Sequence, residues 1–323
     1  MKTESSAAWF RHGRKNLLLS LKDNKQVKRF WKSRFLLLLF LPTFIYYILF
    51  KYVPIWGISI ALYDYNIWAG LEGSKYIGLR NFELFFASPD CFKITKNTFV
   101  LGMQSLLVSF PITILFSLLL NEIKSDKFKK FTQTISYMPH FLSTVVICGL
   151  VVNFCDPTTG LINTVIKLCG GKSIYFITQS KWFRPIYLIS EIWQGLGWGS
   201  IVYLAAISNV DPVLYEAARL DGAGRWRQMV SITLPAIAPT VATMLILKVG
   251  RMMNDSLEKV LLLQVPSTYD VSQTISTYVY QVGLERVDYD YSAAVNLYSS
   301  LINLVLLVGA NWISKKLTET SIF

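Results

Sequence analysis

Long apolar stretches separated by short polar segments are the main pattern of this chain. A helix that crosses a bilayer needs about 20 mostly apolar residues, and it satisfies all its backbone polar groups internally. Six stretches have this character and predict six membrane-spanning helices, near residues 34–62, 98–120, 135–154, 185–207, 236–252 and 293–313. Lys248 and Arg251 limit the apolar part of the fifth stretch. We therefore expect an all-α polytopic membrane protein.

The composition supports this expectation. Apolar residues make up 53% of the 323 residues, charged residues make up 16%, and the mean hydropathy is +0.40, which is unusual for a soluble protein. The predicted organisation is a basic tail (1–33), a membrane domain (34–315) that contains a polar loop at 209–235, and a short C-terminal tail (316–323).

The basic residues predict the orientation. The first 34 residues hold ten Lys or Arg against Glu4 and Asp23, and four lysines follow the second span at positions 124, 127, 129 and 130. Because basic loops stay on the cytoplasmic side, both segments are expected there. Six spans then also place the loop 209–235 and the C-terminus inside, and the segment 255–290 outside.

The net charge of +12 invites comparison with nucleic-acid-binding proteins. Much of the excess lies in the tail beside the first span, where attraction to anionic membrane lipid explains it better. Apolar residues alternate with basic ones in this tail, including Trp9, Phe10 and Leu17, so we expect an amphipathic helix on the membrane surface. The tail lacks the small-residue cleavage site of a signal peptide and is expected to remain.

The loop 209–235 contains strong helix boundary signals. Asp211 suits an N-cap, Pro212 suits the first helical position, and Gly222 suits the left-handed position after the last turn. These signals predict a helix of about ten residues. A second helix should begin near Arg225 and lead through Pro235 into the fifth span.

The same loop carries a family motif. Its residues follow the order Glu216-Ala217-Ala218, then Gly222, then Ile232-Thr233-Leu234-Pro235. This order resembles the permease subunits of binding-protein-dependent ABC importers. Asp221-Gly222-Ala223 is similar to the carbohydrate branch, which includes the maltose and alginate permeases. The stretch 261–284 also resembles the permeases for oligosaccharides and polysaccharide fragments, and the stretch 78–82 is similar to the importer permease family as a whole.

The resemblance implies a function and a set of partners. The chain would form half of the path of an ATP-driven oligosaccharide importer in the bacterial cytoplasmic membrane, with a second homologous permease, two ATPase subunits and an extracytoplasmic solute-binding protein. ATP and Mg would bind to the ATPase subunits and not to this chain. The residues expected to couple the chain to the ATPase are Glu216, Ala217, Ala218, Asp221, Gly222, Leu234 and Pro235.

No catalytic or metal centre can be assembled from the sequence. The two histidines, His12 and His140, lie far apart, and the four cysteines do not have paired ligand spacing and are expected to be small buried side chains. Gly170-Gly171-Lys172-Ser173 lacks the earlier glycine of a phosphate-binding loop and is expected to be a turn. We therefore expect a transport subunit without a cofactor and without its own enzymatic activity.

The substrate path should be lined by polar and aromatic residues of otherwise apolar helices, because ionisable groups at membrane depth usually face an aqueous cavity or each other. The candidates are Glu191, Trp193, Gln194, Trp198, Asn254, Asp255, Tyr278, Tyr280 and Gln281. Two structural alternatives stay open. The glycines around Trp198 suit close helix packing, and tyrosines near a membrane interface often serve only as anchors.

Other functions also stay open. An ABC importer for a phosphonate, a polyamine or an amino acid would keep the motif of the loop 209–235 but not its carbohydrate-type context. A secondary transporter would need no ATPase and should show inverted repeats or an intramembrane ion relay. We find no such repeat, and the helix of the loop 209–235 would then be unexplained.

Overall fold

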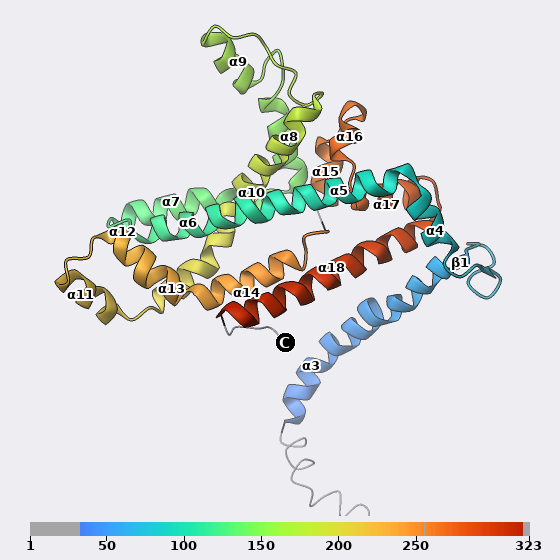
Figure 1. The fold of residues 1–323 in the computed structure, drawn as a ribbon, viewed down its shortest axis with the longest axis horizontal. Coiled ribbons are helices and arrows are strands. Elements are labelled where there is room, and N and C mark those ends of the chain that lie inside the picture. The colour runs from blue at the N-terminus through green and yellow to red at the C-terminus, as the bar shows by residue number, and fades with distance from the viewer. Residues whose placement is uncertain (1–32, 255, 319–323) are drawn as a thin grey trace, which may run out of the picture. The chain divides into compact units, whose positions relative to one another are not determined.

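The computed structural model describes residues 33–254 and 256–318, and it divides into two compact units, Met1–Ser59 and Ile60–Phe323 (Figure 1). The described part of the first unit is an apolar helix. It consists of α3 (Arg34–Tyr47), a π-helical segment (Ile48–Tyr52) and the start of a 3-10 segment (Val53–Leu62). The predicted basic tail, apart from Ser33, lies outside the described residues, and so do residues 319–323.

The second unit begins with a small hairpin and a long helix. The elements are β1 (Tyr63–Asp64), the antiparallel β2 (Lys75–Tyr76), α4 (Arg80–Ala87), α5 (Pro89–Gln104), a π-helical segment (Ser105–Ser109) and α6 (Phe110–Asn121). The Ser88 hydroxyl accepts a hydrogen bond from the Asp90 N–H and so caps α5. Together α5 to α6 form one helix of 33 residues, which is longer than the predicted span at 98–120.

The third predicted span, 135–154, is not one straight helix. It is divided between α7 (Asp126–Tyr137), a 3-10 turn (Met138–Phe141) and α8 (Thr144–Phe154), with a bend of 102°. Pro139 has no N–H to continue α7, and the Ser143 hydroxyl accepts from the Val146 N–H and starts a new helix. These two local signals explain the break. The helices α9 (Leu161–Leu168) and α10 (Ser180–Ser208) follow.

The remaining helices alternate between short and long elements. They are α11 (Pro212–Leu220), α12 (Arg225–Gln228), α13 (Leu234–Ala236), α14 (Ala238–Val249), α15 (Leu257–Leu263), α16 (Tyr269–Ser272), α17 (Ile275–Tyr280) and α18 (Tyr289–Thr318). The fifth predicted span, 236–252, coincides with α14, and a bend of 63° separates α14 from α12 and α13. Pro239 in the first turn of α14 fits this boundary.

Three described helices are long and apolar enough to cross a membrane: Phe35–Leu62, Pro89–Asn121 and Tyr289–Lys316. Counting each bent pair as one span raises this number to five. The predicted fourth span lies in α10, which has 29 residues but carries several polar and glycine residues. The described helices therefore supply up to five candidate spans, and the count of six stays a prediction.

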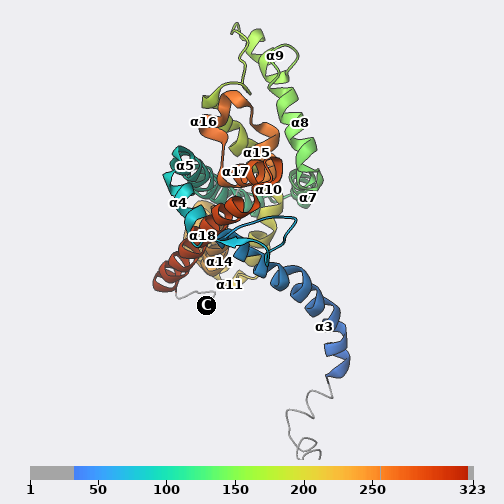
Figure 2. The same cartoon turned by 90° about the vertical axis from the view of Figure 1, so that its right-hand side faces the viewer.

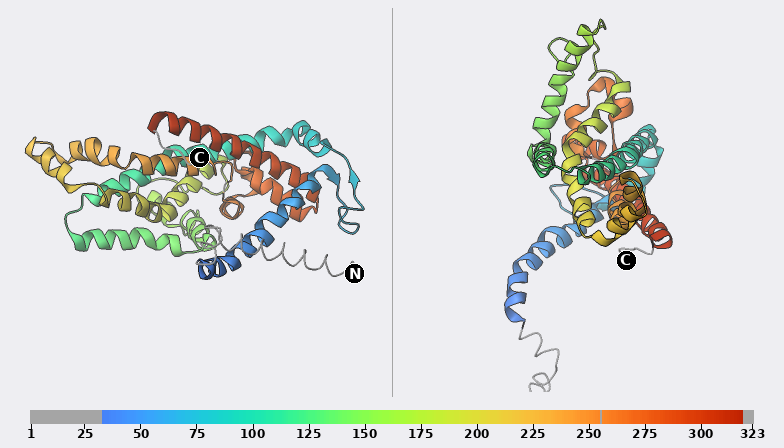
Figure 3. Two further views of the ribbon diagram at one scale, coloured as in Figure 1. Left: turned by 90° about the horizontal axis from the view of Figure 1, so that it is seen from below. Right: turned by 90° about the vertical axis from the view of Figure 1, so that its left-hand side faces the viewer.

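The long helices of the second unit pack into a bundle. α10 contacts α6, α7 and α14, while α18 contacts α14, α17 and α4. Seen end-on, α9 stands away from this bundle, while α8 packs against α15 and α10 (Figure 2). Seen from below, α11 lies at one end of the bundle, opposite the end that holds the β-hairpin (Figure 3).

The cysteines only partly match the prediction of buried side chains. Cys148 and Cys155 are buried, Cys91 is half-buried, and Cys169 is exposed. The prediction is therefore wrong for Cys169, which follows the last turn of the exposed helix α9. The turn predicted at Gly170 is present, and that glycine has a φ of 83°.

Gly197 allows α10 to approach the chain at the end of α7. A Cβ atom at this position would lie 2.1 Å from the carbonyl oxygen of Ser136, a backbone atom that cannot move alone. We expect Gly197→Ala to destabilise the fold by about 1–3 kcal/mol, as overpacked sites do. Gly195 on the same helix has open space around it and supplies a matched control.

The measurement is the thermal unfolding midpoint of the purified variants in one detergent. Gly197→Ala should unfold at a clearly lower temperature than the wild type, and Gly195→Ala should not. Equal midpoints for the two variants would contradict this packing argument.

Candidate functional site

The loop 209–235 folds around α11, whose two ends are capped by its own residues. The Asp211 carboxylate accepts from the Val213 N–H at 2.9 Å. At the other end the Gly222 N–H bonds to the Arg219 carbonyl, and the Ala223 N–H bonds to the Ala218 carbonyl, at 3.1 and 2.8 Å. This is a Schellman motif, and it requires the left-handed backbone of Gly222, whose φ is 76°.

Hydrogen bonds on the less exposed side of α11 connect this part of the loop 209–235 to the helical segments that follow it. The Tyr215 hydroxyl and the Thr233 hydroxyl are 2.9 Å apart, and the Gln228 amide donates to the Ala223 carbonyl at 2.6 Å. Leu234 and Pro235 then lead into α13. Because both ends of the loop are held, α11 and the start of α14 are mechanically connected.

The outer surface of α11 is open to solvent. Glu216 and Ala217 are exposed, Ala218 is half-buried, and Asp221 and Gly222 are exposed. Val213, Leu214 and Leu220 are also exposed, with Leu220 at 90%. No side-chain hydrogen bond or ion pair joins the Glu216 carboxylate to another described residue. An exposed apolar surface around a free carboxylate is typical of a docking site.

A cavity of about 510 Å³ lies between α5, α10, α14 and α15. Its polar lining comprises Ser105, Glu191, Gln194, Lys248, Arg251, Asn254, Ser256 and Lys259. Ser105 is the middle residue of the 33-residue helix Pro89–Asn121, and Glu191 and Gln194 lie near the middle of α10. The cavity is therefore at half the height of the bundle, where transporters usually hold their substrates.

Local structure explains how these side chains reach the cavity. The helix Pro89–Asn121 changes to π-helical geometry at Ser105, and such bulges redirect side chains at functional sites. Gly102 lets this helix pass close to the segment after α14, since a Cβ there would lie 2.3 Å from the Met252 carbonyl oxygen. The Ser256 hydroxyl caps α15 by accepting from the Lys259 N–H at 3.4 Å.

Positive charge predominates around the cavity. Lys248 Nζ lies 3.3 Å from Glu191 Oε1, and the Ser105 hydroxyl donates a short hydrogen bond to the same oxygen. Arg251 also lines the cavity. Lys259 is only 4% exposed, and no described residue forms a hydrogen bond or an ion pair with its ammonium group. Three cations thus face a single carboxylate among the described lining residues.

The burial of Lys259 has an electrostatic consequence. Loss of hydration lowers the pKa of Lys259, while Cys148 and Glu191 act in the opposite direction. A buried ammonium group without a direct counter-ion is unfavourable, and an anionic ligand in the cavity would stabilise its charged form.

The predicted path residues separate into several groups. Glu191, Gln194 and Asn254 line the cavity together. Trp193 lines a different, apolar groove between α8, α9 and α10. Trp198 stacks on His140 with the ring centroids 4.4 Å apart. Asp255 lies outside the described residues.

The three candidates of the segment after α15 do not line this cavity. Tyr278 is buried in a core with Phe85 and Ile94, and its hydroxyl lies 3.3 Å from that of Tyr291. Gln281 accepts a hydrogen bond from Gln273 at 3.1 Å, and Tyr280 is half-buried at the end of α17. A role of these residues in the path stays a prediction.

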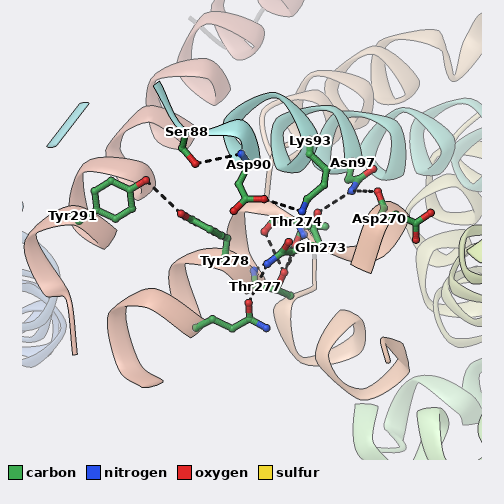
Figure 4. Close-up of polar contacts among 11 residues, drawn as sticks. Ser88, Asp90, Lys93, Asn97, Asp270, Gln273, Thr274, Thr277, Tyr278 and Tyr291 are labelled. Carbon is green, nitrogen blue, oxygen red and sulfur yellow. Dashed lines mark hydrogen bonds and ion pairs between the residues drawn. The ribbon is translucent and has the colours of Figure 1, made fainter. Parts of the chain in front are cut away.

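Asn97 on α5 holds the segment of α16 and α17 in place, as Figure 4 shows (Figure 4). Its amide donates to the carbonyl oxygens of Asp270 and Gln273 at 3.0 and 3.1 Å, and its own oxygen accepts from Arg184 at 3.0 Å. The Thr98 hydroxyl accepts from the Ile275 N–H at 2.8 Å. These bonds fix the segment beside α5, although its helices are only four and six residues long.

Replacement of Asn97 by alanine removes three of these bonds and leaves buried polar groups without partners. The expected cost is about 1–3 kcal/mol for each such group. Limited proteolysis should therefore cut the variant faster within residues 264–285. Lys93→Ala is the control, because the 2.8 Å ion pair of Lys93 with Asp90 is more than one-third exposed and contributes little. Equal cleavage rates for both variants would contradict this function of Asn97.

Sequence reasoning missed Ser105, Arg251 and Lys259 as candidate site residues. Arg251 was considered only as a charge at the end of an apolar stretch, whereas Lys248 was also among the polar residues in or next to the spans that were considered for the path. Ser105 is one of many hydroxyls in apolar helices, and Lys259 belongs to a short amphipathic stretch outside the predicted spans. A basic residue beside an apolar segment is the signal that could have selected Arg251 as well.

Comparison with known proteins agrees with this arrangement. Residues 109–319 match the family described as the binding-protein-dependent transport system inner membrane component. The chain is 44% identical over 310 residues to the polygalacturonan/rhamnogalacturonan transport system permease protein YteP of Bacillus subtilis (strain 168). The matched region covers 96% of this chain and 94% of YteP. It is 39% identical to Protein LplB of the same organism over 292 residues, covering 90% and 92% of the two chains.

Solved structures give the same result. A bacterial alginate ABC transporter in complex with an alginate pentasaccharide-bound periplasmic protein contains a chain with a TM-score of 0.84 and 39% identity. The match covers 91% of this chain and 99% of that one. A secondary transporter, which works without a binding protein, does not fit this family. This chain has apolar helices, and the family model matches more than half of its length. The chain therefore belongs to the inner membrane components of binding-protein-dependent transport systems.

Proposed function

We propose that this chain is a transmembrane subunit of an ATP-driven importer for acidic oligosaccharides. The observation that carries the acidic preference is the buried ammonium group of Lys259, which lines the cavity without a described counter-ion. Lys248 and Arg251 add two further cations. Uronic acid residues offer the carboxylates that such a site would bind, and their hydroxyls suit Gln194, Asn254 and Ser256.

The relatives support this choice of substrate. YteP is named for polygalacturonan and rhamnogalacturonan, and the solved transporter is described as importing the acidic polysaccharide alginate. The cavity volume of about 510 Å³ is within the range of about 300–1,000 Å³ typical of small-molecule sites. It suits a segment of a short oligosaccharide in one subunit, with the remainder held by a second permease.

In this proposal α11 is the contact with a separate ATPase subunit. The exposed Val213, Leu214 and Leu220 would be covered on docking, and Glu216 would supply the charged contact. The bond between Tyr215 and Thr233 links α11 to the helix that leads into α14, and the last turn of α14 carries Lys248, which lines the cavity. Movement of α11 would thereby alter the cavity.

The remaining partners complete the proposed assembly. One homologous permease, two ATPase subunits that bind ATP and Mg, and an extracytoplasmic solute-binding protein would act with this chain. Both termini would lie in the cytoplasm of a bacterial cell. Transport would proceed by alternating access, in which ATP binding and the loaded binding protein favour the outward-open state.

Co-purification with candidate subunits tests this proposal. The detergent-solubilised assembly would be assayed for ATP hydrolysis with a binding protein that is either empty or loaded with tetragalacturonate. The proposal predicts faster hydrolysis with the loaded protein. Absence of an associated ATPase, or equal rates with the empty and loaded proteins, would contradict it.

A further inference from the structure

Glu191 is an unusual neighbour for an acidic substrate. It is the only carboxylate among the described residues that line the cavity, and it lies between α5 and α14. Its Oε1 atom takes both described contacts, the hydrogen bond from Ser105 and the ion pair with Lys248. Its Oε2 atom is buried and has no hydrogen-bond partner among the described residues.

Only one of the two carboxylate oxygens of Glu191 therefore interacts with described residues. A structural buried ion pair normally satisfies both oxygens, because each unpaired one loses hydration without compensation. Here the ion pair is partly open, with side-chain exposures of 30% for Lys248 and 26% for Glu191. The contact between Lys248 and Glu191 can therefore be exchanged for another carboxylate that reaches the cavity.

We infer that Glu191 acts as an internal competitor for the substrate, occupying Lys248 in the empty cavity and yielding it to the carboxylate of an incoming uronic acid. This inference rests on the acidic substrate proposed above. After the exchange Glu191 keeps its hydrogen bond from Ser105. Glu191 is then a specificity residue, because a neutral sugar has no group that can replace it on Lys248.

The competition has two consequences for transport. It neutralises part of the positive charge while the cavity is empty, which disfavours the binding of small anions. It also lowers the affinity of the cavity for the acidic sugar, which helps a transporter to release that sugar on the other side of the membrane. Both consequences depend on the negative charge of Glu191 and not on its shape.

The direct test is Glu191→Gln, which removes the charge and keeps the length of the side chain and an acceptor for Ser105. The full-length chain, together with the subunits that co-purify with it, would be placed in nanodiscs. Calorimetry would measure the binding of tetragalacturonate and of its neutral methyl ester. We expect the variant to bind the acid about three- to tenfold more tightly, as removal of one competing contact suggests. Binding of the ester should change less than twofold.

Glu258→Gln is the matched control. Glu258 is an exposed carboxylate beside Lys259, but it does not line the cavity, so its removal should alter acid binding less than twofold. A similar gain in both variants would indicate a general charge effect and overturn the inference. Unchanged or weaker acid binding by Glu191→Gln would also overturn the inference. In that case the proposed function would still hold if the wild-type protein binds the acid more tightly than the ester.

Two further outcomes are decisive. A wild-type protein that binds acid and ester equally would overturn both the proposed acidic substrate and this inference. If Glu191→Gln fails to fold, Glu191→Asp replaces it, since the shorter side chain retracts the carboxylate from Lys248. This variant should bind the acid about twofold more tightly, and unchanged or weaker binding would overturn the inference.

Discussion

Replacement of Glu216 by lysine is expected to abolish ATP-driven uptake while leaving the chain folded. Glu216 is exposed on α11, and no other described residue forms a hydrogen bond or an ion pair with its carboxylate, so the fold does not depend on this side chain. Reversal of its charge would repel a basic partner group at a close contact, where like charges cost several kcal/mol. The measurements are ATP hydrolysis by the assembly and uptake into proteoliposomes, and both should fall to background.

The control for Glu216→Lys is Glu122→Lys, which makes the same change of charge just after α6, outside α11. This variant should keep most of the wild-type uptake. Binding of the sugar by the separate binding protein should be unaffected in either case. Normal uptake by Glu216→Lys would show that α11 is not the contact with the ATPase.

Replacement of Lys259 by glutamine is expected to cause the second large effect, a loss of affinity for acidic sugars. A hydrogen bond between charged groups contributes about 1.5–3 kcal/mol, which corresponds to roughly 10- to 100-fold in affinity. The KM for tetragalacturonate should rise by about this factor, and the KM for its methyl ester should change little. Glutamine keeps most of the length of the side chain, and it removes an unfavourable buried charge, so the fold should tolerate it.

Lys181→Gln is the control, because Lys181 is an exposed lysine at the start of α10 and lies against the ring of Trp182. It should leave both KM values unchanged. If Lys259→Gln raised the KM of the acid and the ester equally, Lys259 would have a general structural function and the acidic preference would need another cause.

The loop 209–235 shows what local sequence signals can predict. Asp211, Pro212 and Gly222 each act on the backbone within a few residues, and the helix boundaries follow from them without any tertiary information. The approximate positions of the long apolar helices were also predictable, because a span needs about 20 apolar residues. Their lengths were not, since the helix predicted at 98–120 extends over Pro89–Asn121. The 102° bend between α7 and α8 was missed, although Pro139 and Ser143 could have indicated it.

The cavity shows where such prediction ends. Glu191, Gln194 and Asn254 were selected because polar groups are costly in apolar segments, and the structure brings them together. The placement of Lys259 beside them depends on how α15 folds back against α8 and α10. Trp198 was chosen for its aromatic ring, but its neighbour in the structure is His140, a pairing between distant segments that periodicity does not reveal.

The most direct test of the central claim is uptake of labelled tetragalacturonate into proteoliposomes that contain the complete assembly, the binding protein outside and ATP with Mg inside. The account predicts uptake that requires ATP, exceeds that of the methyl ester and is lost in Lys259→Gln. Uptake without ATP would contradict the importer mechanism. Equal uptake of acid and ester would contradict the function assigned to the cationic cavity.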